Sequence, residues 1–100
     1  MTKSKKPKKD NRWTVNIKRC ISKTFLPEGV KESLIALVRE IEVNGPGKGN
    51  WPNYGKLSSD IHHCHLKDGR PTYVAVWEVT DKKLKTVVVT YAGTREKAPY

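Results

Sequence analysis

The chain has 100 residues, of which 36% are hydrophobic, enough for one domain with a small core and too few for two domains. Twenty Lys and Arg against ten acidic residues give a formal net charge of +10, which favours a polyanionic partner, nucleic acid ahead of an anionic membrane. Neither an apolar run of membrane-spanning length nor a disulfide framework is present, since the two cysteines lie in unlike settings, so we expect a cytoplasmic protein that does not enter a membrane.

Residues 1–11 hold five lysines, a proline and no large apolar residue after the initiator. This composition predicts a disordered basic tail, followed by one folded domain over residues 12–100. The tail is interpreted either as a solubilising segment or as an arm that adds non-specific affinity for nucleic acid. Its lysines also permit a nuclear-localisation interpretation.

Apolar and polar residues alternate in 12–18, RWTVNIK, which predicts a strand with one buried face. The segment RCISKTFL, 19–26, is long enough for one short helical turn. From Pro27 onward the apolar period becomes helical, and Gly45-Pro46 ends it. This amphipathic helix is predicted to cover the apolar face of a sheet.

A Gly-, Pro- and Asn-rich loop is predicted over residues 44–60. Lys48 stands among its glycines, but the spacing of a nucleotide phosphate loop is absent. Trp51 is predicted to anchor the loop to the core. Tyr54 is either a second anchor or a platform on which a base stacks. Lys56 is expected to reach the polar face of the next strand.

The stretch 62–79, HHCHLKDGRPTYVAVWEV, predicts a β-hairpin with a tight turn at Asp68-Gly69. Counting outward places Lys67 opposite Arg70, His65 opposite Thr72 and His63 opposite Val74. Because side chains alternate along a strand, one face is predicted to be apolar (Cys64, Leu66, Tyr73, Ala75, Trp77 and Val79) and the other protonatable and cationic (His63, His65, Lys67, Arg70 and Thr72).

The run His62-His63-Cys64-His65 also resembles a metal-binding sequence. Alternation puts only two of these ligands on each side of the strand, too few for a tetrahedral zinc site. We therefore expect no metal or other cofactor. Cys64 is interpreted as a small buried hydrophobe, because the core face offers it no base. A last strand is predicted in LKTVVVTY, 84–91, after a turn at 80–83.

The predicted order, strand, helical region and three-strand antiparallel meander, is an α+β fold with a small antiparallel sheet. Together with Lys56-Leu57, the hairpin HLKDGRPTYVAVWEV and the ending Gly93-Thr-Arg95-Glu96 with Tyr100, it resembles the toxins of the RelE/ParE superfamily, which act in type II toxin–antitoxin pairs. The likeness spans residues 12–100. Two departures stand out: the first of the usual two helices is shortened to 19–26, and Lys67 replaces an arginine.

The RelE branch of this resemblance implies an endoribonuclease that enters the ribosome and cuts translated mRNA without metal, and that a cognate antitoxin neutralises. Such cleavage needs a base for the ribose 2′-OH, cations for the transition state and an acid for the 5′ oxygen. The family's Lys, Arg and Tyr set corresponds to Lys56, Lys67, Arg95 and Tyr100. His63, His65 and Arg70 are additions.

His65 is predicted to act as base or acid, with Tyr100 as the alternative, because an imidazole exchanges protons near neutral pH. RNA contacts are predicted at Lys48, Tyr54 and Lys56. Two other functions stay open. One is a ParE-like gyrase inhibitor that works by binding alone, and the other is a non-catalytic RNA-binding module.

Overall fold

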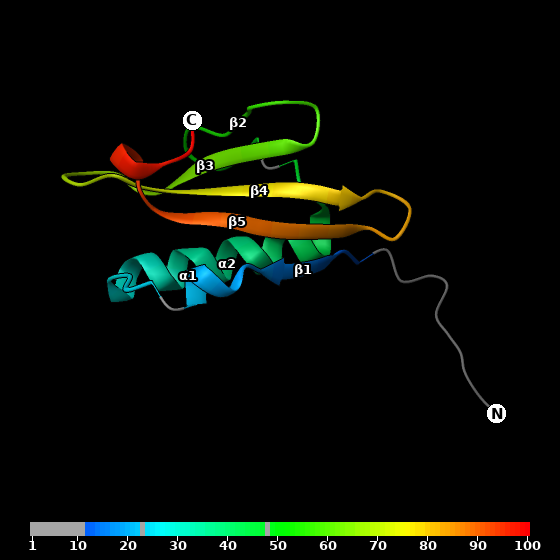
Figure 1. Ribbon diagram of the computed structural model, residues 1–100, viewed down its shortest axis with the longest axis horizontal. Helices are drawn as coiled ribbons and strands as arrows, with labels where there is room; N and C mark the ends of the chain where they lie inside the picture. Colours follow the sequence, from blue (N-terminus) through cyan, green and yellow to red (C-terminus); the bar gives the residue numbers. More distant parts are fainter. Residues whose placement is uncertain (1–11, 23, 48) are drawn as a thin grey trace.

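The computed structural model describes residues 12–22, 24–47 and 49–100; the predicted tail (1–11) and Lys48 lie outside them. Its elements are β1 (Thr14–Ile17), α1 (Arg19–Ser22), α2 (Glu28–Asn44), β2 (Gly55–Lys56), β3 (Ile61–Lys67), β4 (Tyr73–Asp81), β5 (Thr86–Thr94) and the 3₁₀ turn η1 (Arg95–Lys97). Figure 1 shows the two helices beside β1 and β5, and the C-terminus beside β2 and β3. Within the described residues, no helix is both long and apolar enough to cross a membrane.

The fold is α+β, with one five-stranded sheet in the order β1-β5-β4-β3-β2. Strands β3 to β5 form the predicted antiparallel meander. The prediction of a purely antiparallel sheet is wrong, because β1 pairs with β5 in parallel, with Val15 beside Val87. Alternation predicts only the face that a residue occupies. The direction of pairing depends on how the intervening chain returns, which alternation does not encode.

Helix α2 covers one face of the sheet as its periodicity predicts. It begins after Pro27 and ends where the Gly45 N–H donates to the Ile41 carbonyl at 2.8 Å. Gly45 has a φ of 90°, and a Cβ there would lie 3.2 Å from Trp13 Nε1. Glycine therefore suits both the backbone and the space at this end. The residues that α2 buries are Val30, Leu34, Leu37 and Ile41.

The core lies between α2 and the sheet. Trp77, Leu37 and Ile41 are its largest fully buried side chains, and each stabilises the fold by about 1.5–3 kcal/mol through burial. Trp77 Nε1 donates to the Pro46 carbonyl at 3.0 Å, which fixes the loop after α2. Trp51 packs against the same cluster, so the predicted anchor is confirmed.

The hairpin has the predicted faces but a different turn. His65 pairs with Val74 and His63 with Val76, each two residues beyond the predicted partner. The tight turn at Asp68-Gly69 is therefore wrong, and residues 68–72 form a wider loop. Pro71 accounts for the difference, because it has no N–H to donate to a ladder that would run up to the turn. A shift of two residues keeps His63 and His65 on their predicted face, whereas the ladder is irregular between His65 and Lys67.

The last strand lies later in the chain than predicted, since β5 runs from Thr86 to Thr94 in place of 84–91. Thr90 lies opposite a register shift, between the pairs Val89–Trp77 and Tyr91–Val76. Tyr91 shares the face of Val76, and its Oη donates to the Thr94 carbonyl at 2.6 Å.

Candidate functional site

The sheet face away from α2 carries His63 and His65, as predicted, but it is partly covered. Val74 and Val76, their cross-strand partners, are 0% and 2% exposed. The cover is the chain after β5. The Arg95 N–H donates to the Thr72 carbonyl at 2.9 Å, and the Tyr100 ring packs on His63 with 4.8 Å between ring centroids. Residues 95–100 therefore bring Arg95 and Tyr100 to the histidines.

His63 is held as a neutral imidazole. Burial lowers its pKa from 6.5, and the neighbouring side chains of His65 and Arg95 lower it further. Its Nδ1 atom is buried without a hydrogen-bond partner among the described residues. Its Nε2 atom faces Gly55 of β2, where a Cβ would come within 3.0 Å. The absence of a side chain at Gly55 therefore leaves room for this ring.

His65 has a carboxylate partner that sequence reasoning missed. Its Nδ1 atom lies 2.5 Å from Asp68 Oδ1, and its backbone N–H donates to the Pro52 carbonyl at 2.8 Å. A carboxylate on one ring nitrogen orients the imidazole and leaves Nε2 to exchange protons. The three-residue spacing from His65 to Asp68 was a usable signal, but Asp68 was interpreted only as a turn residue.

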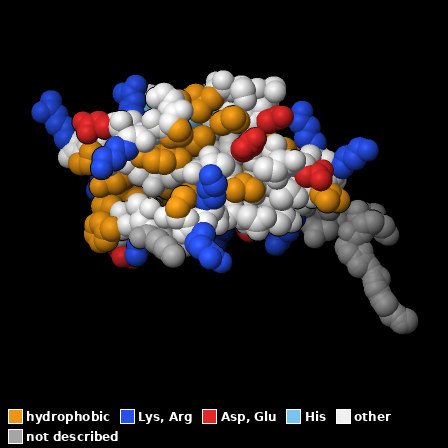
Figure 2. Space-filling view, in the orientation of Figure 1, with side chains coloured by type: hydrophobic (Ala, Val, Ile, Leu, Met, Phe, Trp, Pro, Cys, Tyr) orange, Lys and Arg blue, Asp and Glu red, His pale blue; other side chains and the backbone are white. Residues whose placement is uncertain are grey.

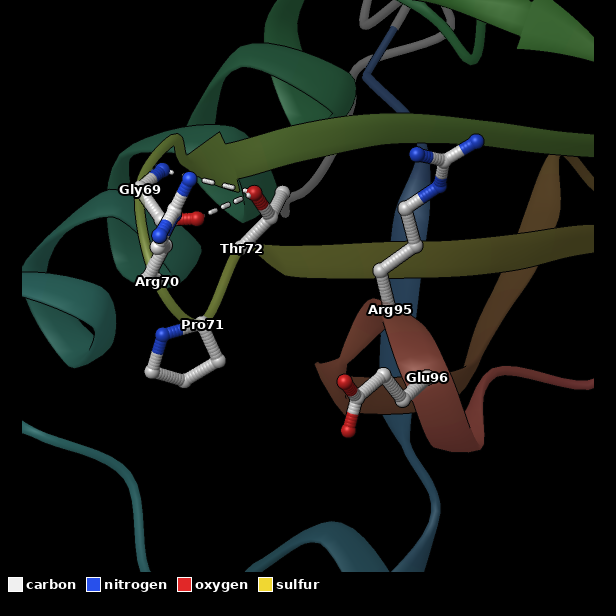
Figure 3. Close-up of a pocket in the computed structure, with 6 residues that line it drawn as sticks. All are labelled: Gly69, Arg70, Pro71, Thr72, Arg95 and Glu96. Carbon is white, nitrogen blue, oxygen red and sulfur yellow. Dashed lines mark hydrogen bonds between the residues drawn. The ribbon is translucent and has the colours of Figure 1, made fainter.

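Arg70 and Arg95 line one pocket of about 730 Å³ between the 68–72 loop and η1. Figure 3 shows Gly69, Arg70 and Thr72 on one side and Arg95 and Glu96 on the other. Hydrogen bonds between Gly69 and Thr72, at 2.8 and 3.3 Å, close the loop that carries Arg70. The side chains of Arg95 and Glu96 point in different directions (Figure 3), so Glu96 does not cover the guanidinium.

Tyr100 carries a neutral phenol at neutral pH. Burial raises its pKa above the ordinary value of 10, and the positive charge of Arg95 opposes this shift. A protonated phenol is a hydrogen-bond donor and a potential proton donor. Tyr100 is 46% exposed, so one side of its ring is open to solvent while the other side lies on His63.

The remaining predicted site residues lie apart from this cluster. Lys67 is exposed at the end of β3. Lys56 pairs with His62, so it lies on the helix side of the sheet and not on the polar face where it was expected. Tyr54 packs against the core, and its Oη lies 2.7 Å from His62 Nδ1. Of the two roles considered for Tyr54, these contacts fit an anchor of the loop. The predicted contact at Lys48 lies outside the described residues.

Comparisons with protein-family models, curated proteins and solved structures find no match to this chain. Its chemistry is therefore inferred from the cluster itself, which we name the His63–Tyr100 site: His63, His65, Asp68, Arg70, Arg95 and Tyr100. It combines two imidazoles, a carboxylate, a phenol and two guanidinium groups. Such a set can move protons and stabilise a phosphate-like anion.

Cationic side chains are also exposed outside this cluster. Figure 2 shows Lys and Arg at the outline of one face and across it, with acidic side chains among them. In the described part of the chain, no three His, Cys, Asp or Glu side chains lie close enough together to hold a metal ion. His62 and Cys64 point into the core, away from His63 and His65.

Proposed function

We propose that this protein is a RelE-like toxin, an endoribonuclease that cuts translated mRNA by metal-independent acid–base chemistry. The observation that carries the proposal is the packing of Tyr100 on His63 beside Arg95. It joins a phenol, imidazoles and a guanidinium from two segments that the predicted fold alone leaves separate. The strand, helix and meander order also agrees with the resemblance.

In the proposed reaction the ribose 2′ oxygen attacks the adjacent phosphorus and the P–O5′ bond breaks. The products are a 2′,3′-cyclic phosphate and a free 5′-OH. His65, oriented by Asp68, accepts the 2′-OH proton at Nε2. The Tyr100 phenol donates a proton to the leaving O5′. Arg70 and Arg95 stabilise the charge on the phosphorane-like transition state from their shared pocket.

His63 has a positioning role in this mechanism. Its ring packs against the Tyr100 ring and holds it in place. Because the pKa of His63 is lowered, the imidazole brings no positive charge to the phenol at neutral pH. Lys67, exposed at the end of β3, supplies a phosphate contact outside this cluster. A cognate antitoxin protein is the partner that this function implies.

The test is cleavage of mRNA on purified ribosomes, with transcript 5′ ends mapped after addition of the protein. We expect cuts within translated codons, and a loss of about 10²–10⁴-fold in rate for His65→Ala and for Tyr100→Phe. Lys83→Ala, on the exposed turn after β4, is the matched control and keeps the wild-type rate. Retained cleavage in both site variants would refute these roles. Expression in bacteria that breaks DNA without cutting transcripts would point instead to gyrase.

A further inference from the structure

Strand β1 is an edge of the sheet. The N–H groups of Thr14 and of Lys18, the residue after the strand, donate toward β5, to the carbonyls of Lys85 and Val89 at 2.8 and 3.1 Å. Because alternate residues of a strand bond to the same side, the N–H groups of Val15 and Ile17 point away from β5. Within the described residues no further strand lies on that side, and only the beginning of the edge is occupied, where the Trp13 N–H donates to the Glu42 carbonyl of α2 at 2.8 Å. An edge of this kind can pair with another chain.

An apolar groove runs beside this edge, on the helix side of the sheet. Two shallow pockets, of about 200 and 190 Å³, share Ile17, Leu34 and Ile35. One of them extends toward Ile21 and the other toward Val38. Ile17 is 44% exposed and Ile35 is 53% exposed. The short β1 and the short α1 leave this flank of α2 uncovered.

The edge and the groove fit the same occupant. Trp13, Val15 and Ile17 alternate along the chain, and the first two pack against the core, so Ile17 also faces the helix side. A strand added beside β1 would continue the pleat. Every second side chain of that strand would then enter the groove between Ile17 and Ile35, while its backbone paired with Val15 and Ile17.

The charges around the groove indicate what kind of chain would bind there. Lys31 and Arg39 line the groove and Lys18 follows Ile17, against one lining carboxylate, Glu42. A second copy of this protein fits poorly, because antiparallel pairing of β1 with itself would bring Arg12 of one copy near Lys18 of the other. Like charges placed opposite each other on paired strands are destabilising, and each copy carries +10.

We propose that β1 and its groove form a docking surface for an extended, acidic segment of another protein with alternating apolar residues. The segment adds a sixth strand to the sheet and fills the groove with its apolar side chains. The surface uses no residue of the His63–Tyr100 site. The docking proposal can therefore be tested independently of the proposed ribonuclease activity.

Two fluorescein-labelled nine-residue peptides test this proposal. One alternates Val with Glu and Thr, and the other has Lys in place of each Glu. We expect the acidic peptide to bind, measured by anisotropy, and to shift the amide resonances of Val15 and Ile17. The basic peptide binds at least about tenfold more weakly. Ile35→Glu weakens binding of the acidic peptide by at least about tenfold.

Val43→Glu is the matched control, because Val43 is an exposed apolar residue of α2 that lines neither pocket. It makes the same charge change outside the groove and leaves the affinity within about twofold of wild type.

Absence of acidic-peptide binding, equal effects of the two variants, or amide shifts away from β1 would each overturn the proposal. Sedimentation showing a β1-dependent dimer would assign the surface to a second copy. mRNA cleavage by Ile35→Glu stays at the wild-type rate.

Discussion

At the scale of single residues, the pairing of His65 with Asp68 is the most informative detail of the site. The carboxylate lies 2.5 Å from Nδ1 and comes from the loop that Pro71 forces open. A loop of this width lets Asp68 turn back toward β3. The two-residue turn predicted from the sequence would have used Asp68 for backbone geometry alone.

Asp68→Asn is expected to lower the rate of mRNA cleavage by about tenfold or more, because an amide does not hold the imidazole in the same orientation and charge state. The rate on programmed ribosomes measures this effect. Glu32→Gln removes an exposed carboxylate of α2 that lies outside the site, and it keeps the wild-type rate. An Asp68→Asn protein with undiminished cleavage would show that His65 needs no orienting partner.

His62 makes stability depend on pH. It is 4% exposed and stacks on Trp77, with ring centroids 5.8 Å apart. Burial lowers its pKa from 6.5, Lys56 lowers it further, and Asp60 opposes the shift. Below pH 6.5 the unfolded chain therefore takes up a proton that the folded chain resists. The free energy of unfolding must fall as pH drops below this value.

Urea denaturation between about pH 7.5 and pH 5 measures this dependence. We expect the midpoint to fall toward acid pH in the wild type and to fall less in His62→Phe, which cannot be protonated. His63 titrates in both proteins, so the difference between the two curves isolates His62. Parallel curves would show that His62 takes up its proton equally in the folded and unfolded chains.

At the scale of elements, α2 has one face buried against the sheet and another exposed at the groove. Leu37 is fully buried against the sheet, whereas Ile35 is 53% exposed on the groove side. We expect Leu37→Ala to lower the free energy of unfolding by about 2–5 kcal/mol through lost burial and the cavity it leaves. Ile35→Ala should change it by less than about 0.5 kcal/mol. Urea denaturation of both variants at one pH provides the comparison, and equal losses would contradict this assignment of faces.

The β3–β4 hairpin shows why faces are easier to predict than partners. His63 and His65 lie on the predicted face although their partners, Val76 and Val74, differ from the predicted ones. Face depends only on parity, which a two-residue shift preserves. Partner depends on the loop, and there Pro71 outweighs the turn preference of Asp68-Gly69.

At the scale of the whole molecule, the net charge of +10 is the property with the widest consequence. Residues 1–11 carry five of the lysines. We expect their removal to weaken RNA affinity at low salt and to make its dependence on salt shallower, because fewer counterions are released on binding. Titrations of a labelled single-stranded RNA at several salt concentrations test this. An unchanged slope would leave the folded domain as the source of the phosphate contacts.

From the sequence alone one could determine helix α2, the three-strand meander and the face that each histidine occupies. These features follow from the spacing of apolar residues and from composition, both of which can be read within a short stretch of sequence. Tertiary structure decided the parallel pairing of β1 with β5, the place of Lys56 on the helix side, and the packing of Tyr100 on His63. Each of these joins segments that are distant along the chain or depends on a loop. The spacing of apolar residues carries no information about such contacts, because they form only when the whole core packs.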